Sequence, residues 1–320
     1  MNREGDNPER VQYKIAAFYC FASIQENTLV SLLNQVVVDA SNEKIKGMVL
    51  LANEGVNGTI CGTPKAISFF IEKIQLFLPE NKFEIKYSWS SKQTFRKFRA
   101  RRKAEIVTMG IEKVDPRKIV GEYVEPADWH RCLDDPYTLV IDTRNKYEIA
   151  VGTFQGSLNP NTDTFREFPD WVEQTLRPLA EEKNIKHISM FCTGGIRCEK
   201  ATSYLKEQGF ESVKHLHGGI LRYLEETPRD ESRWEGECFV FDRRVALSHN
   251  LSPGTHRLCN ACGMPLSAED LKKENYIRGV KCHYCADRFT DADRLRFAER
   301  QKHIDQLTEK FPGNTLWPNP

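Results

Sequence analysis

A cysteine that is followed by a glycine-containing turn and an arginine is the feature of this sequence best suited to chemistry. Cys192 comes directly after an apolar run, His187 to Phe191, that is typical of a buried strand, and ahead of a helical pattern from Cys198 to Gln208. The backbone N–H groups and the dipole at a helix N-terminus favour negative charge, and both lower the pKa of a nearby thiol. The position therefore favours a reactive thiolate at Cys192. The other interpretation is an ordinary strand-to-helix turn with a half-buried cysteine.

The other residues of this loop suit the binding of an anion, and they are Thr193, Gly194, Gly195, Ile196, Arg197 and Cys198. The two glycines let the backbone turn and present N–H groups to an anion. A guanidinium is too weak an acid for proton transfer, so we expect Arg197 to brace the loop and contact an anionic substrate. Cys198 has two interpretations, either a thiol that forms a disulfide with an oxidised Cys192 or a small packing residue.

Four further cysteines have the spacing of a metal site. Two Cys-x2-Cys pairs are separated by nineteen residues, and they consist of Cys259, Cys262, Cys282 and Cys285. Two such pairs provide four thiolates for tetrahedral Zn²⁺, so the sequence predicts a structural zinc site. The neighbouring histidines, His256 and His283, are not expected to be ligands because four thiolates already complete the coordination. The alternative is a small domain with four unmetallated thiols.

A short basic segment predicts contact with nucleic acid. Six of the eight residues from 96 to 103 are Lys or Arg, and an aromatic side chain lies among them. Clustered cations neutralise phosphates, and aromatic or guanidinium planes stack on bases. The predicted RNA-binding residues are Arg96, Lys97, Phe98, Arg99, Arg101, Arg102 and Lys103. The alternative is a solvated linker that happens to be basic.

The elements around these motifs predict a mixed α/β chain of three parts. Residues 1–110 have the β-α-β-β-α-β order of a ferredoxin-like, or acylphosphatase-like, α+β domain that carries the basic segment. Residues 120–230 alternate strands with helices, as a parallel α/β sheet does. Residues 231–320 form a small four-cysteine domain, resembling a zinc ribbon, with a terminal helix. After the basic segment, at the end of the first part, Glu105 to Met109 is expected to be a short strand.

The terminal helix is expected from Asp291 to Phe311. Its predicted inner face is apolar and consists of Leu295, Ala298, Leu307 and Phe311.

Composition sets few limits on function. The 46 basic and 45 acidic residues give a net charge of +1, so the overall charge says nothing about a polyanionic partner. The N-terminus lacks an apolar signal-peptide core, and no apolar run approaches the roughly 18 residues of a membrane span. The cysteines are used in a metal-type pattern and a reactive loop, which suits a reducing cytosol better than a disulfide scaffold. We therefore predict a cytoplasmic protein with no membrane partner, of an oligomeric state that the sequence does not specify.

The loop at Cys192 resembles the active-site loop of the rhodanese family. The matching residues extend from about 120 to 228 and include an early strand that ends in Asp142-Thr143-Arg144, the segment from Tyr147 to Asn159, and Val213 to Ile220. The resemblance implies a doubly wound parallel sheet, in which Asp142 and Arg144 are supporting residues that pair to hold loops. Related phosphatases have five residues between Cys and Arg, whereas four lie between Cys192 and Arg197. The smaller loop suits a sulfur atom or a reactive thiol better than a phosphate ester.

Nearly the whole chain resembles the bacterial tRNA uridine-34 hydroxylase family. Beside the Cys192 loop, the resemblance is carried by Leu50 to Ile60 and by Trp234 to Asp242, ahead of the four-cysteine tail. It implies an oxidoreductase that hydroxylates C5 of the wobble uridine in the tRNA anticodon loop, with molecular oxygen as co-substrate and an essential cysteine at the position of Cys192. No flavin or haem signature is visible in the sequence.

Three functions compete at this point. The full-length resemblance and the basic segment favour a tRNA-modifying oxygenase, in which a Cys192 thiolate adds to C6 of uridine so that an oxidant can attack C5. The loop alone favours a sulfurtransferase that carries a persulfide on Cys192. The third is a non-enzymatic module that binds an anion or a partner, and the intact cysteine and arginine argue against it.

Overall fold

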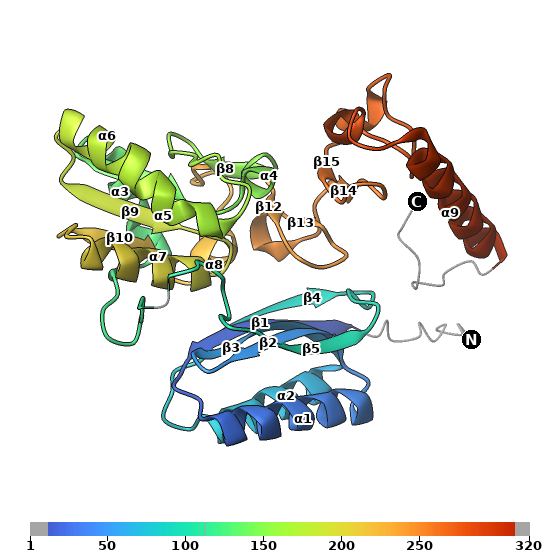
Figure 1. Ribbon diagram of the computed structural model, residues 1–320, viewed down its shortest axis with the longest axis horizontal. Coiled ribbons are helices and arrows are strands. Elements are labelled where there is room, and N and C mark those ends of the chain that lie inside the picture. The colour runs from blue at the N-terminus through green and yellow to red at the C-terminus, as the bar shows by residue number, and fades with distance from the viewer. Residues whose placement is uncertain (1–11, 112, 311–320) are drawn as a thin grey trace, which may run out of the picture. The chain divides into compact units, whose positions relative to one another are not determined.

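The computed structural model describes residues 12–111 and 113–310, and its contacts divide the chain after Ile106 into two units. In the first unit, two helices cover one face of a five-stranded sheet of order β4-β1-β3-β2-β5 (Figure 1). The first four strands are antiparallel, as the predicted ferredoxin-like order requires. The elements are β1 (Tyr13–Phe21), α1 (Glu26–Asn42), β2 (Lys46–Ala52), β3 (Gly55–Gly62), α2 (Pro64–Phe77), β4 (Glu84–Ser90) and β5 (Phe98–Arg102).

The basic segment is the fifth strand of this sheet rather than a linker. Its residues 98–102 form β5, which pairs in parallel with β2. The strand predicted over Glu105 to Met109 is wrong, because residues 105–109, all of them described, form no strand. The backbone there is held by side chains instead: Ile106 N–H donates to Glu54 Oε1 at 2.6 Å, and Asn57 Nδ2 donates to Ile106 O at 2.9 Å.

The second unit is built on a four-stranded parallel sheet of order β6-β10-β9-β7. Its elements are β6 (Glu122–Val124), α3 (Trp129–Asp134), β7 (Thr138–Asp142), α4 (Lys146–Ile149), β8 (Gly152–Phe154), α5 (Phe168–Trp171), a π-helical turn (Val172–Leu176), α6 (Arg177–Glu182), β9 (His187–Phe191), α7 (Ile196–Glu207), β10 (Val213–Leu216) and α8 (Gly219–Glu226). Helices α5 and α7 pack on one face around Met190, and α3 and α8 pack on the other around Phe191, so the sheet is doubly wound as predicted.

The segment that follows α8 packs on this core. Strand β11 (Trp234–Gly236) pairs with β8, and Trp234 stacks edge-on against Phe154 at 5.0 Å between ring centroids. The next two strands, β12 (Cys238–Phe239) and β13 (Ala246–Leu247), pair with each other, and Cys238 and Leu247 belong to the same buried cluster. Residues 234–251, which the sequence analysis assigned to the C-terminal part, therefore cover one side of the parallel sheet.

The four-cysteine part follows as two short strands, β14 (Arg257–Leu258) and β15 (Pro265–Leu266), and the helix α9 (Asp291–Lys310). The predicted inner face of this helix is wrong at two positions, because Leu295 is 70% exposed and Ala298 is also exposed, whereas Leu307 is half-buried. The buried side chains of α9 are Gln301 and Ile304. The spacing of apolar residues did not identify the inner face, because α9 is held partly by a polar contact. In this contact Asn260 Nδ2 donates to Gln301 Oε1 at 3.0 Å. Phe311 lies outside the described residues.

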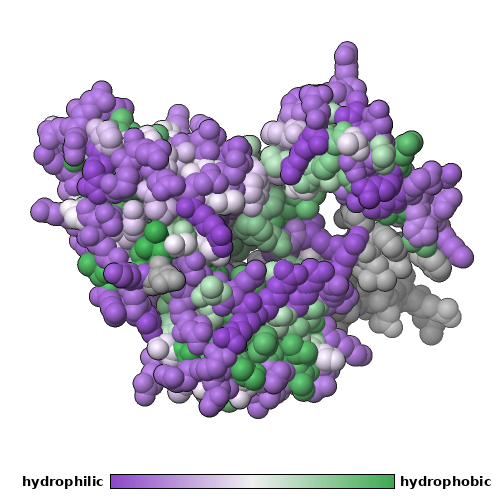
Figure 2. Space-filling model, in the orientation of Figure 1, coloured by the Kyte–Doolittle hydropathy of each residue, from purple (hydrophilic) through white to green (hydrophobic). Residues whose placement is uncertain are grey.

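The surface seen in Figure 2 is mostly hydrophilic, and one of its apolar areas lies over α1. Its exposed apolar side chains include Val30, Val37 and Val38. Among the described helices, none is both long and apolar enough to cross a membrane.

Candidate active site

The Cys192 thiol lies at the end of β9, where the chain turns into α7. The turn needs glycine at one position, because Gly195 has a φ of +103°, which side-chain-bearing residues rarely adopt. This conformation aims the Gly195 N–H at Cys192 Sγ, which accepts its hydrogen bond at 3.1 Å. A Cβ added at Gly194 would meet no atom within 4 Å. Of the two glycines in the loop, Gly195 is therefore the one that shapes the turn.

The surroundings of Cys192 favour its thiolate form. Burial alone raises the pKa of this thiol, but hydrogen bonds from the Cys198 side chain, the positive charge of Arg197 and the backbone N–H groups of both residues outweigh it. Together they lower the pKa of Cys192 from 9.0 to about 5. The thiol is only 1% exposed, so these donors act at short range and without competing water. The geometry agrees with the thiolate expected from the strand-to-helix position.

Arg197 is held by a buried carboxylate that the sequence analysis did not single out. Its two terminal nitrogens donate to the carboxylate of Glu148 at 2.6 and 2.8 Å, and Glu148 is fully buried. Burial raises the pKa of Glu148, but the Arg197 cation and its hydrogen bonds dominate and lower it. The expectation that Arg197 braces the loop agrees with this pairing. Contact of Arg197 with an anionic substrate stays a prediction.

A sequence signal for Glu148 was present in the turn before α4. Asn145 and Glu148 occupy the two positions of a capping box, and Asn145 N–H donates to Glu148 Oε2 at 3.1 Å. This hydrogen bond holds the carboxylate against the start of α4 and so helps to fix its direction. The pattern Asn-x-x-Glu predicts such a helix start, but it does not reveal the distant arginine that completes the pair.

A second helix also holds the Cys192 loop. At the start of α8, Ile220 N–H donates to Cys192 O at 2.9 Å and Leu221 N–H donates to Thr193 O at 3.1 Å. Gly219 makes this approach possible: its φ is +66°, and a Cβ there would lie 2.5 Å from Cys192 O. The Gly-Gly turn that resembled the last part of a rhodanese domain therefore supports the cysteine loop directly.

Asp142 and Arg144 form a buried ion pair beside the site. Arg144 Nε and Nη2 donate to the two oxygens of Asp142 at 2.8 and 2.6 Å, and both side chains are fully buried. Arg144 Nη2 also donates to Gly152 O at 2.6 Å. The pair thus ties the end of β7 to the start of β8, which is the supporting arrangement expected for it.

The basic segment divides between the two faces of its sheet. Phe98 packs edge-on against Phe70 of α2, with ring centroids 5.9 Å apart. Arg102 lies on the same face of β5, four residues after Phe98. It donates to both carboxylate oxygens of Glu26 at 2.6 and 2.8 Å. Arg99 and Arg101 alternate with these residues, so they point to the face that the helices leave open. Arg96, Lys97 and Lys103 flank the strand and are exposed.

The position of Phe98 limits the contacts that the basic segment can make with RNA. Its ring packs against the core beneath the helices, together with Ala100. We therefore assign Phe98 to packing, and a proposal for RNA contact rests on the cationic side chains.

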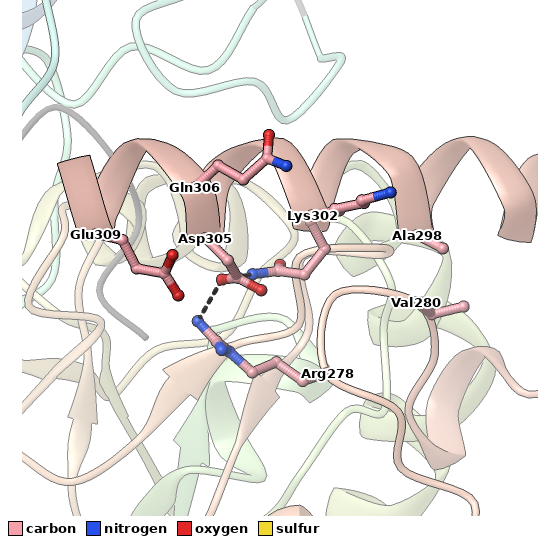
Figure 3. Close-up of a pocket in the computed structure, with 8 residues that line it drawn as sticks. Arg278, Val280, Ala298, Lys302, Asp305, Gln306 and Glu309 are labelled. Carbon is pink, nitrogen blue, oxygen red and sulfur yellow. Dashed lines mark hydrogen bonds and ion pairs between the residues drawn. The ribbon is translucent and has the colours of Figure 1, made fainter.

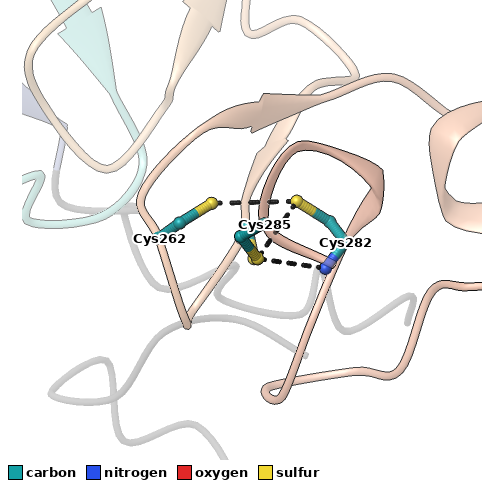
Figure 4. Close-up of side chains that lie close together, drawn as sticks. Cys262, Cys282 and Cys285 are labelled. Carbon is teal, nitrogen blue, oxygen red and sulfur yellow. Dashed lines mark hydrogen bonds between the residues drawn. The ribbon is translucent and has the colours of Figure 1, made fainter. Parts of the chain in front are cut away.

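The four cysteines of the tail come together as a candidate metal centre. Their sulfur atoms all lie within 4.8 Å of one another (Figure 4 shows three of the four residues). Cys282 Sγ lies 3.7 Å from both Cys262 Sγ and Cys285 Sγ. Zinc–sulfur bonds of about 2.3 Å place tetrahedral thiolates about 3.8 Å apart. The cluster therefore has the dimensions that a four-thiolate metal site requires, and it could hold a metal ion.

One cavity in the described part of the chain lies apart from Cys192. It lies along α9 and is lined by side chains that include Arg278, Lys302, Asp305 and Glu309 (Figure 3). Arg278 Nη2 and Asp305 Oδ1 form an ion pair at 3.0 Å across it. None of the residues that line it is a cysteine or a histidine, so it holds no nucleophile comparable with Cys192.

Comparison with known proteins gives matches to both units and to the whole chain. Residues 13–106 match the UPF0176 acylphosphatase-like domain, and residues 125–226 match the rhodanese-like domain. A protein of Prochlorococcus marinus named tRNA uridine(34) hydroxylase is 57% identical, and the match covers 96% of each chain. A protein of the same name from another strain of P. marinus, NATL2A, is 53% identical over 99% of each chain. A third, from Parasynechococcus marenigrum (strain WH8102), is 55% identical over 92% of this chain and 93% of its own.

Proposed function

This chain belongs to the tRNA uridine(34) hydroxylase family, and we propose that it hydroxylates C5 of uridine 34 in tRNA with molecular oxygen as co-substrate. The relatives that carry this name match it over nearly their full length. The observation that supports the chemistry is the buried Cys192 thiolate, whose pKa is lowered to about 5 by fixed donors. Cys192 is the catalytic residue of the proposal, and it reacts as a nucleophile.

The thiolate would act on the uracil ring by conjugate addition. The sulfur forms a bond to C6, and the electron pair of the C5–C6 double bond moves onto C5 and the C4 oxygen. C5 then carries enolate-like electron density and attacks a hydroperoxide that an external reductant has formed from O₂ with two electrons and two protons. The O–O bond breaks, one oxygen stays on C5 as a hydroxyl, and the other leaves as hydroxide, which takes up the C5 proton as water. Loss of the C5 proton and of the Cys192 thiolate restores the double bond. The low pKa of Cys192 favours both the addition of the sulfur to C6 and its later elimination, because a stabilised thiolate is present at neutral pH and is a good leaving group.

The buried position of the sulfur implies that the base must come to it. Cys192 is 1% exposed, so a base that remains stacked in the anticodon loop would not reach the sulfur. Bases in anticodon loops can be splayed out of the stack and enter a pocket. We propose that the wobble uridine enters the site in this way.

The basic segment is the proposed contact for the tRNA backbone. Arg99 and Arg101 lie on the open face of the sheet and are exposed, and Arg96, Lys97 and Lys103 flank them. Phosphate contacts from such side chains supply affinity that does not depend on sequence. Arg102 is a weaker candidate, since Glu26 already neutralises it.

The remaining assignments follow from the same proposal. The four-cysteine cluster would hold one structural Zn²⁺, which would stabilise a segment with few other buried side chains. We keep the three-part organisation of residues 1–110, 120–230 and 231–320 as a proposal, in which residues 234–251 of the last part pack on the parallel sheet. We also propose a cytoplasmic location, because the proposed substrate is tRNA.

Mass spectrometry of tRNA nucleosides from cells with and without the protein tests the proposed function. A gain of one oxygen on uridine 34 that disappears with the gene supports it, and restoration by the wild-type gene is the control. Failure of the wobble uridine to change would contradict it.

A sulfurtransferase remains the second candidate. It is favoured by the four-residue interval between Cys192 and Arg197, which suits a bound sulfur atom. In that case Cys192 would carry a persulfide, and the same nucleoside measurement would find sulfur in place of oxygen.

A further inference from the structure

We propose that Phe241 is a base-stacking residue, whose ring stacks on a nucleotide next to uridine 34 when that uridine enters the site of Cys192. The inference rests on the proposed function, since it takes the anticodon loop as the substrate. It adds a contact to a base beside the wobble uridine, whereas the basic segment is proposed to contact only the phosphate backbone.

Phe241 is an aromatic side chain that the fold leaves in solvent. It is 63% exposed, the largest exposed fraction of any aromatic side chain in the described part of the chain. Its ring meets the ring of Phe239 with 5.2 Å between the centroids and 88° between the planes. In such a perpendicular contact, Phe239 covers at most one flat face of the Phe241 ring. A flat face therefore stays open to a planar ligand.

The hairpin turn after Phe241 holds a strained backbone. Val245 has a φ of +66°, which a β-branched residue rarely adopts. Val245 N–H donates to Asp242 O at 3.0 Å, and Val240 N–H donates to Val245 O at 2.8 Å. Arg244 Nη2 pairs with the buried carboxylate of Asp242 at 2.5 Å. These contacts give Phe241 a rigid support, and strain that the surrounding structure maintains is typical of ligand-binding sites.

A line of contacts leads from the candidate active site to Phe241. Helix α4 supplies Glu148, which binds Arg197 of the cysteine loop. The preceding residue of α4, Tyr147, packs edge-on against Phe239 with 5.4 Å between ring centroids. Strand β12, which ends at Phe239, lies beside α4 (Figure 1). Phe241 therefore lies near the edge of the parallel sheet that carries the nucleophile.

The surface at Phe241 fits a single base. The apolar residues nearest to it in the hairpin, Phe239, Val240 and Val245, are buried, so the exposed apolar area is that of one ring. An area of this size suits a base better than the apolar face of a protein helix. Residues 241–245 include two arginines and one aspartate, so their net charge is positive and favours the phosphates on either side of a base.

The chemistry of the proposed substrate calls for such a contact. A uridine that leaves the stack takes a stacking partner away from each of its neighbours. Aromatic side chains replace such partners in proteins that bind single-stranded RNA, because every base has a π face. The ring of Phe241 would thus stabilise the form of the anticodon loop in which uridine 34 is splayed out.

Tyr137 provides a matched control for an exposed aromatic side chain. It is 54% exposed and directly precedes β7, whereas Asp142 ends this strand. Tyr137 therefore lies at the opposite edge of the same sheet from the cysteine loop. A general affinity of exposed rings for RNA would depend on Tyr137 as well as on Phe241.

The test is a double-mutant cycle between the full-length protein and an anticodon stem-loop RNA. Two further RNAs have an abasic nucleotide on the 5′ or the 3′ side of uridine 34. With the intact RNA, Phe241→Ala should weaken binding about 5- to 150-fold, the effect of losing one stacked base. With the RNA that lacks the stacked base, the same substitution should change the affinity less than about twofold, because ring and base act as a pair.

Three further measurements separate stacking from other effects. Phe241→Tyr keeps an aromatic ring and should bind the intact RNA as the wild type does, and so should Tyr137→Ala. The slope of log affinity against log salt should be the same in Phe241→Ala and the wild type, since the ring carries no charge. Thermal unfolding checks the fold of each variant. Phe241→Leu, which keeps apolar bulk without a ring, takes the place of Phe241→Ala if that variant does not fold.

Four results would overturn the proposal. One is wild-type affinity in a folded Phe241→Ala protein. Another is the same loss with the intact RNA and with both abasic RNAs, which would mean that the ring touches neither neighbouring base. The third is a Phe241→Tyr protein as weak as Phe241→Ala, and the fourth is wild-type protein with no affinity for the stem-loop. Binding requires no hydroxylation, so the nucleoside measurement judges the proposed function separately, and either proposal can fail while the other stands.

Discussion

At the scale of single residues, the site is a thiolate that its immediate neighbours stabilise. Gly195 contributes a backbone N–H, Cys198 a thiol, and Arg197 a positive charge. Glu148 acts one step further out, because it fixes Arg197. The chemistry and the stability of the loop can therefore be tested at separate positions.

Cys192→Ser should abolish hydroxylation and leave the fold intact. A serine hydroxyl stays protonated at neutral pH and cannot replace a thiolate, so we expect a loss of at least about 10³-fold, as for other covalent nucleophiles. Nucleoside mass spectrometry of tRNA incubated with purified protein measures the effect, with thermal unfolding as the check on folding. Cys238→Ser is a control for the loss of a buried thiol outside the loop. Wild-type activity in a folded Cys192→Ser protein would remove Cys192 from the mechanism.

The rate of hydroxylation should follow the ionisation of Cys192. With a pKa lowered to about 5, the thiolate predominates at neutral pH and is lost as the pH falls through that value. The rate with saturating tRNA should therefore be level from about pH 6 to 8 and should drop about tenfold per unit at more acidic pH. A rate that still rises between pH 7 and 9 would mean an ordinary thiol and contradict the geometry.

Glu148→Gln should destabilise the second unit. The change keeps the shape of the side chain but leaves the Arg197 cation buried without its counterion, at a cost of about 3 kcal/mol or more. The folded-state pKa of Glu148 is lowered, so this contribution is present above its usual value of 4.5 and is lost as the pH falls through the folded value. Urea unfolding at pH 7 measures it. Equal stability of the variant and the wild type would show that the ion pair contributes nothing.

At the scale of elements, the Cys192 loop depends on the N-termini of two helices. At the edge of the first sheet, the alternation of side chains along β5 decides which residues face the helices. The N-terminus of α7 receives the thiolate, and the N-terminus of α8 binds the carbonyls of the loop. In the first unit, alternation along β5 sends Phe98 toward the helices and Arg99 toward the open face. Matched substitutions can separate these effects.

Gly195→Ala and Gly194→Ala form one such pair. Alanine at Gly195 would be strained by the φ of +103°, so the turn would shift and the N–H would leave Cys192 Sγ. We expect Gly195→Ala to raise the pH midpoint of Cys192 alkylation by iodoacetamide, with which only the thiolate reacts, by about one unit, whereas Gly194→Ala, which has open space for a Cβ, should not. Equal midpoints in the two variants would show that the Gly195 geometry does not tune the thiol.

The cationic side chains of β5 should differ in their effect on tRNA binding. Replacing Arg99 and Arg101 by alanine should weaken affinity and reduce the slope of log affinity against log salt by about 1.5 to 2, because two phosphate contacts are lost. Arg102→Ala is the internal control, since Arg102 pairs with Glu26 and its exposed ion pair contributes at most about 1 kcal/mol to stability. Binding across a salt series measures both. An unchanged slope in the folded double variant would return the segment to a purely structural role.

At the scale of the whole molecule, two different sources of stability are expected. The parallel sheet has large buried clusters on both faces, whereas the four-cysteine part has a small cluster made largely of the cysteines themselves. A metal would therefore supply much of the folding energy of that part.

Chelation should release one Zn²⁺ per chain and loosen the C-terminal part. Elemental analysis should find the metal in the purified protein, and hydrogen exchange should rise in residues 255–310 after treatment with a strong chelator, while the sheet strands stay protected. Cys259→Ser should reproduce the effect without chelator. Protein that contains no zinc and has a folded tail with four titratable thiols would contradict the site.

The sequence by itself determined the features that depend on short spacing. The strand, turn and helix around Cys192 follow from a local pattern, and so do the two Cys-x2-Cys pairs and the β-α-β-β-α-β order of the first unit. Such patterns are readable because neighbouring residues share one element, whose periodicity or turn geometry each of them must fit. The resemblance to known families then pointed to the reaction.

Only the tertiary structure decided the contacts between residues far apart in the chain. It paired Glu148 with Arg197, brought the start of α8 onto the carbonyl of Cys192, placed the basic segment at the edge of a sheet, and turned Gln301 rather than Leu295 toward the core. Each of these depends on which surfaces meet when apolar area is buried, and on where a buried polar group then finds its partner. Local periodicity carries no information about that partner, which is why the site could be located from the sequence but not assembled from it.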